Sequence, residues 1–149
     1  MSTYSNTPSG SAYEDEIYQE LYILSRHWKS DLEFYKDDLR FLHNLVDKYL
    51  IWITKKENLE IVNTIRKKEF SLGVQCANLL EEISKHLNEG ALILKNSNTS
   101  PLGNYRKNHL SLENAMAQFV KEFRENRKEV FKVTEYIMDS EELGRILDT

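Results

Sequence analysis

The sequence predicts an all-α protein, an antiparallel up-down-up bundle of three long helices with coiled-coil-like packing. The 149 residues include only five Gly and two Pro, so few positions interrupt a helix. Charged residues make up 30% of the chain and apolar residues 40%, a balance typical of helices with one buried and one solvated face. Apolar residues also recur at steps of three and four, the spacing that places them on one side of a helix.

The first long helix is expected over about residues 13–53, after a disordered N-terminal tail at 1–12 that is rich in Ser, Thr, Gly and Pro. No Gly or Pro occurs in the helical range. A heptad-like apolar stripe with one additional residue step runs along it, formed by Ile17, Leu21, Leu24, Trp28, Leu32, Tyr35, Leu39, Leu42, Val46, Tyr49 and Ile53. A second stripe lies beside the first and comprises Phe34, Phe41, Leu45 and Trp52. Two stripes widen the apolar face, so this helix should contact two neighbours.

Two further helices are expected over about 55–88 and 111–139. Thr54 and Glu57 fit a capping box at the start of the second helix, and Gly90 is a plausible terminator. The turn-forming run NSNTSPLGN predicts a long loop over 91–108. Residues 140–149 are expected to form a C-terminal tail. The short first connection makes its helices antiparallel neighbours, and 13–139 should form a single domain.

Composition and charge exclude several classes of protein. The formal net charge is −4, and the basic residues of the third helix alternate with Glu residues as on a solvated face, so nucleic-acid binding is not expected. No apolar run approaches 18 residues, and the first residues lack the pattern of a signal peptide, so we expect no membrane span and a cytoplasmic location. The single Cys excludes an intramolecular disulfide and a CxxC zinc site.

No catalytic or cofactor motif is complete, and we expect no enzyme activity, no cofactor and no metal. Glycine-rich phosphate loops and the G-x-S-x-G elbow are absent. None of the four His residues follows a carboxylate by three positions, as a carboxylate-bridged di-iron bundle requires. His27/Asp31 and His43/Asp47 are spaced for ordinary pairing on a helix surface. Cys76 lies in the apolar stripe of the second helix, where a buried and inert thiol is expected.

Two polar residues interrupt the apolar stripes, Glu69 in the second helix and Asn126 in the third. Polar residues at such positions can specify helix register or oligomeric state at a cost in stability. For Asn126 we favour this register role. For Glu69 we favour a side chain that reaches water, because charged side chains are rarely buried without a partner.

The aromatic residues of the first helix indicate an interface. Three packed helices leave part of so wide an apolar face uncovered, and a twofold dimer is the usual way to bury such a face. We expect the interface to include Trp28, Tyr35, Tyr49 and Trp52. The partner is then a second copy of the chain or another helical protein.

The stretch LEFYKDDLRFLHNLVDKYL, with its Phe34-Tyr35-Lys36 and Phe41-Leu42 pattern, resembles a family of small uncharacterised helical proteins of Bacteroidetes-type bacteria. The resemblance covers the first two helices and implies no activity or ligand. The sequence therefore predicts a non-catalytic interaction or scaffold module. The alternative is a ligand- or metal-binding bundle, sensor-like or weakly enzymatic, which would use core residues such as Glu69, Cys76, Glu82 and His86.

Overall fold

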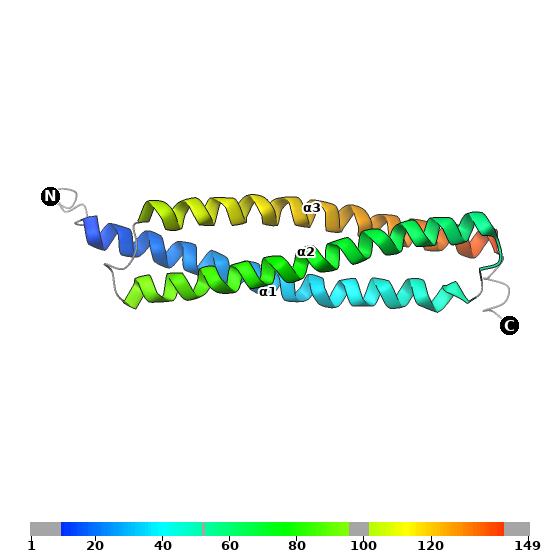
Figure 1. Cartoon of the computed structure of the whole chain (residues 1–149), viewed down its shortest axis with the longest axis horizontal. Coiled ribbons are helices and arrows are strands. Elements are labelled where there is room, and N and C mark those ends of the chain that lie inside the picture. The colour runs from blue at the N-terminus through cyan, green and yellow to red at the C-terminus, as the bar shows by residue number, and fades with distance from the viewer. Residues whose placement is uncertain (1–9, 52, 96–101, 142–149) are drawn as a thin grey trace. The chain divides into compact units, whose positions relative to one another are not determined.

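The computed structural model describes residues 10–51, 53–95 and 102–141, and within these ranges it contains three helices and no strand. The helices are α1 (Gly10–Leu50), α2 (Lys56–Lys95) and α3 (Leu102–Ser140), joined in that order (Figure 1). All three pack against one another through the contacts described below. The predicted all-α, antiparallel three-helix fold is therefore confirmed.

The helices are longer than predicted at the second connection. α2 continues past Gly90 to Lys95, and α3 begins at Leu102 rather than at 111. Most of the loop predicted over 91–108 is therefore helical, and its remaining residues, 96–101, lie outside the described residues. α1 begins at Gly10, inside the predicted tail, and the rest of both predicted tails, 1–9 and 142–149, also lies outside the described residues.

Gly90 does not end α2, and its environment gives the reason. The residue is buried in the helix, and a Cβ at this position would lie 2.5 Å from Tyr105 Oη and 3.2 Å from Tyr22 Cδ1. Glycine here permits a close approach of aromatic rings rather than a turn. The residues that follow it are needed for packing, because Ile93 joins Tyr18 and Tyr105 in a buried cluster. Burial of these apolar side chains stabilises helix in segments whose composition predicts a loop.

The contacts within the chain group it into two compact units. Unit 1 comprises Met1–Glu33 and Asn78–Ala117, and unit 2 comprises Phe34–Ala77 and Gln118–Thr149. Each helix contributes one part to each unit, where the sequence predicts a single domain over 13–139.

The helix directions follow from contacts inside each unit. In unit 1, Tyr18 near the start of α1 packs with Ile93 near the end of α2 and with Tyr105 near the start of α3. α2 is therefore antiparallel to α1 and α3. In unit 2, Thr54, just before α2, donates its hydroxyl to Glu141, just after α3, at 2.7 Å.

The start of α2 is capped from α3 and not by the predicted Thr54–Glu57 box. Glu141 accepts hydrogen bonds from the backbone amides of Thr54 and Lys55, at 3.2 and 2.9 Å, and from Asn58 Nδ2 at 2.8 Å. A carboxylate that accepts the free amides near a helix N-terminus also interacts favourably with the helix dipole. The cap thus joins two helices that are far apart in sequence.

None of the three helices, over the residues described, combines the length and the apolar character that crossing a membrane requires.

Candidate functional site

The aromatic residues that the sequence places at an interface make contacts inside the chain. In unit 1, Trp28 is half-buried and stacks on His109, with ring centroids 4.5 Å apart. In unit 2, Tyr35 is half-buried against Phe119 and Phe123, at centroid distances of 5.8 and 4.7 Å. These rings attach α1 to α3 and offer only part of their surface to another molecule.

Of the other two predicted interface residues, the structure describes Tyr49. Tyr49 is half-buried, and the Lys48 ammonium lies 5.6 Å from its ring centroid. Trp52 lies outside the described residues.

The second stripe of α1 contributes two exposed aromatic side chains to the surface of unit 2. Phe34 is 62% exposed and Phe41 is 50% exposed, seven residues apart on one helix face. Asp38 lies between them and forms an ion pair with Arg127 of α3 at 2.9 Å. The Arg127 guanidinium in turn lies 4.9 Å from the ring centroid of Phe131, which is 40% exposed. We call Phe34, Phe41 and Phe131 the α1–α3 aromatic surface.

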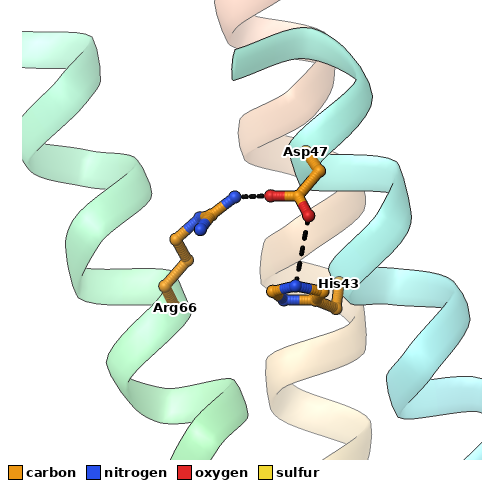
Figure 2. Close-up of polar contacts among 3 residues, drawn as sticks. All are labelled: His43, Asp47 and Arg66. Atoms are coloured by element: carbon orange, nitrogen blue, oxygen red, sulfur yellow. Dashed lines mark ion pairs between the residues drawn. The ribbon is translucent and has the colours of Figure 1, made fainter.

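On the α2 side of α1, the predicted His43/Asp47 surface pair is present and has a third member. His43 Nε2 lies 3.1 Å from Asp47 Oδ2, and the other carboxylate oxygen pairs with Arg66 of α2 (Figure 2). The Asp47 side chain is 44% exposed, so this bridge contributes little to stability. Its geometry is that of a surface ion pair joining α1 to α2 within unit 2.

A buried polar layer in unit 1 was not predicted. His86 of α2 and His109 of α3 are 4% and 5% exposed, and His86 Nε2 lies 3.1 Å from His109 Nδ1. Ser25 of α1 completes the layer, with its hydroxyl 3.5 Å from the same His109 nitrogen. Each helix thus places one polar side chain at this level of the core.

The hydrogen bonds indicate how the protons of this layer are arranged. Ser25 donates its hydroxyl proton to the Leu21 carbonyl at 2.8 Å, so its oxygen accepts from His109. His109 then carries its proton on Nδ1 and shares this one proton between Ser25 Oγ and His86 Nε2. The remaining nitrogen, His109 Nε2, is buried without a hydrogen-bond partner. We assign it as the unprotonated nitrogen, because a bare acceptor is less costly to bury than an unpaired N–H.

The layer holds neutral side chains at pH 7. Burial lowers the pKa of His86 to about 4, and the neighbouring His109 lowers it further. The pKa of His109 is also lowered by burial, against an opposing effect of Glu113. Tyr105 stacks on the His86 ring at a centroid distance of 4.3 Å, and burial together with the charge of Glu89 raises its pKa to about 12. Ser25 is fully buried and its hydroxyl is occupied, so the group lacks an accessible nucleophile.

Unit 2 contains a second polar layer, formed by the two residues that interrupt the apolar stripes. Thr54 lies opposite Glu141. Because α2 and α3 are antiparallel, Glu69, which is 15 residues after Thr54, lies opposite Asn126, which is 15 residues before Glu141. Glu69 is 6% exposed and Asn126 is 3% exposed. The expectation that Glu69 reaches water is therefore wrong, because this level of the core is closed by its neighbours.

Neither residue of this second layer has a hydrogen-bond partner for its side-chain oxygen or nitrogen atoms. Burial raises the pKa of Glu69 to about 7, and the positive charge of Arg66 opposes this shift only in part. The carboxyl is consequently protonated over part of the neutral range, which reduces the cost of burying it without a partner.

A pocket of about 210 Å³ opens between α2 and α3 beside Asn126. Asn126 and Leu72, both buried, form its inner wall, while exposed residues such as Lys68 and Glu125 lie at its rim. The lining of the pocket is therefore polar and includes Asn126, whose side-chain nitrogen and oxygen atoms are themselves closed to solvent.

Cys76 is buried and forms no disulfide, and burial raises the pKa of its thiol, while Lys36 opposes the shift. Its burial agrees with the position in the apolar stripe that the sequence indicates. Within 10–51, 53–95 and 102–141, no three His, Cys, Asp or Glu side chains are grouped so that they could hold a metal ion.

The histidine pair escaped prediction because the third helix was expected to start after His109. A single signal could have found it. The seven-residue pattern of the third helix continues upstream from Leu112 through His109 and Tyr105, which are buried on the same face.

Comparison with family models, with curated proteins and with solved structures finds no match for this chain.

Proposed function

We propose that the chain is a non-catalytic helical interaction module of the cytoplasm that self-associates, with a second copy covering the α1–α3 aromatic surface. The observation that carries the proposal is the exposure of Phe34 and Phe41, 62% and 50%, on one face of α1. Large aromatic side chains gathered on one exposed face are typical of protein interfaces. Complete burial of a Phe side chain contributes about 1.5–3 kcal/mol, so covering these rings on two copies is a substantial driving force.

The charges around the surface favour a second copy as the occupant. Asp37 and Arg40 lie between Phe34 and Phe41 in the sequence, and both are exposed and form an ion pair with each other at 4.0 Å within the chain. An antiparallel pairing that sets Phe34 opposite Phe41 of the second copy brings Asp37 within one helical turn of that copy's Arg40. The surface is thus complementary to itself, as a twofold interface requires.

The ion pair at the centre of the surface makes it rigid before association. Asp38 is only 11% exposed and holds Arg127, whose guanidinium also contacts the Phe131 ring. Side chains that are already fixed lose less conformational entropy on binding. The proposed surface differs from the interface expected from the sequence, which comprised Trp28, Tyr35, Tyr49 and Trp52.

Sedimentation velocity over a concentration series tests the proposal. The wild-type chain is expected to change from monomer to dimer, and the double variant Phe34→Gln/Phe41→Gln is expected to remain a monomer with an unchanged circular dichroism spectrum. The control is Phe70→Gln, since Phe70 is 75% exposed on α2 and lies outside the surface. A wild-type chain that stays monomeric, or a double variant that dimerises as the wild type does, contradicts the proposal.

A further inference from the structure

Arg66 of α2 lies between two carboxyl groups, and it is paired with one of them. Its guanidinium forms an ion pair with Asp47 of α1, which Figure 2 shows. Glu69 lies three residues after Arg66, one turn further along α2, and the positive charge of Arg66 acts on its carboxyl group. All three residues belong to unit 2 and lie outside the α1–α3 aromatic surface, so the proposed self-association does not depend on them.

The two side chains on α2 both have unused hydrogen-bonding groups. Arg66 Nε is closed to solvent and has no hydrogen-bond partner, and the same is true of both carboxyl oxygens of Glu69. A guanidinium group carries five N–H donors and matches a carboxylate in shape. An unpaired donor and two unpaired acceptors therefore lie one helical turn apart.

The two carboxyl groups differ in how much they need Arg66. The Asp47 side chain is 44% exposed and lies 3.1 Å from His43 Nε2, so it keeps water and His43 when Arg66 is absent. Glu69 is buried, and the charge of Arg66 is what opposes the effect of burial on its pKa. Two opposite charges attract each other more strongly where water is excluded, because the dielectric is lower and salt screens them less. A Glu69 carboxylate therefore competes successfully with Asp47 for Arg66.

The charged neighbours of Glu69 on the α3 side are already engaged. They form two ion pairs, Arg127–Asp38 at 2.9 Å and Lys68–Glu129 at 3.2 Å. Asn126, opposite Glu69, is neutral, and Glu122, one turn before it on α3, adds negative charge. These groups offer Glu69 no free cation, so its carboxylate recruits the guanidinium of Arg66.

We propose that Arg66 is a pH-sensitive switch, which pairs with Asp47 while Glu69 is protonated and with Glu69 once that carboxyl group ionises. In the first state Arg66 joins α2 to α1, as in Figure 2. In the second state it compensates the new charge in the core and releases Asp47. Ionisation of one buried residue thus opens an ion pair between two helices of unit 2.

A pH titration of the full chain, followed by NMR of the Glu69 carboxyl carbon and the Arg66 Nε–H group, tests the switch. The Glu69 signal is expected to titrate near pH 7, and the Arg66 signal to shift with the same midpoint. The Glu69→Gln variant should lose this shift. Any shift that remains in the variant comes from His43, and one as large as in the wild type overturns the proposal. Arg127 Nε, which is bonded to Asp38, is the matched control and should not follow the Glu69 midpoint.

Competition between the two carboxylates gives a second test. Asp47→Asn removes the competitor, so it should lower the Glu69 midpoint by about one pH unit, a tenfold loss of proton affinity. Burial and Arg66 set the pKa of Glu69, so this change acts through Arg66. Asp37→Asn, at an exposed position of α1 that pairs with Arg40, is the control and should leave the midpoint unchanged. An Arg66 signal that does not respond to the ionisation of Glu69 overturns the proposal, and so does an equal midpoint in the two Asp variants.

Discussion

Replacement of Glu69 by glutamine tests the polar layer of unit 2, because it removes the titrating group and keeps the size of the side chain. Glu69 is buried without a hydrogen-bond partner, and burial raises its pKa from 4.5 to about 7. In the unfolded chain the carboxyl loses its proton near pH 4.5, whereas in the folded chain it keeps it to about pH 7. The folded state therefore binds more protons in this range, and its stability falls as the pH rises.

The size of the effect follows from the pKa difference. A difference of one pKa unit corresponds to about 1.4 kcal/mol, so the full shift of Glu69 corresponds to about 3 kcal/mol. This stability is present below pH 4.5 and is lost once the pH exceeds about 7. The Glu69→Gln variant has no proton to lose at this position, so it is expected to gain about 2–3 kcal/mol over the wild type between about pH 5 and pH 8.

Urea unfolding at these two pH values, followed by circular dichroism, measures the difference. Both proteins carry the same histidines, so the histidine contribution cancels when the two free energies of unfolding are subtracted. Glu60→Gln, at an exposed position of α2, is the control and should show no such change. If the free energies of unfolding of the wild type and of the Glu69→Gln variant differ by the same amount at both pH values, Glu69 is not buried as a carboxylic acid and the reasoning is refuted.

Three further predictions concern the core. His86 is buried in the neutral form, and its pKa is lowered from 6.5 to about 4. The stability of unit 1 should therefore fall by about 3 kcal/mol as the pH drops from 6.5 to about 4, and native-state hydrogen exchange of the α2 amides near Ile83 measures this fall. Exchange that does not depend on pH, after correction for intrinsic rates, contradicts the prediction. Asn126→Leu removes an unpaired buried amide, so it should increase the free energy of unfolding by about 1–3 kcal/mol and raise the melting temperature. It should also broaden the distribution of oligomers measured by light scattering. An unchanged melting temperature together with an unchanged distribution counts against the register role. Gly90→Ala should destabilise the fold by about 1–3 kcal/mol in thermal unfolding, because the new Cβ meets Tyr105. Gly73→Ala should stabilise it by about 0.5–1 kcal/mol, because the new Cβ lies in open space. Equal effects of the two changes would show that Gly90 is not a packing position.

The core of α2 and α3 was largely predictable because it depends on local spacing. Apolar residues that recur at steps of three and four along these helices are buried, among them Leu72, Ile83, Phe119 and Val130. The same spacing identified Glu69 and Asn126 as members of the core stripes. Whether Glu69 reaches water depends on which residues of the neighbouring helices close over it, and that is a tertiary property.

The second connection was not predictable from composition. The run of Ser, Asn, Gly and Pro predicts a long loop, but Ile93 and Tyr105 lie on either side of it and are buried against Tyr18 of α1. Packing of such residues outweighs a weak local preference for a turn. Gly90 is similar, because its role depends on the position of Tyr105 on another helix.

The candidate interface illustrates a related difficulty. The sequence identifies α1 as carrying too many aromatic residues for one buried face, but both of its stripes have helical spacing. Tyr35 of the first stripe packs on Phe119 and Phe123, which leaves Phe34 and Phe41 of the second stripe exposed. Which stripe is covered depends on the side of α1 that α3 occupies, and no local pattern encodes that.

Isotope-filtered NMR of an equimolar mixture of labelled and unlabelled chain tests the proposed self-association most directly. An antiparallel twofold pairing predicts intermolecular NOEs between the Phe34 ring of one copy and the Phe41 ring of the other. Intermolecular NOEs that arise only from other residues, or none at concentrations where the NMR signals are well resolved, would contradict it.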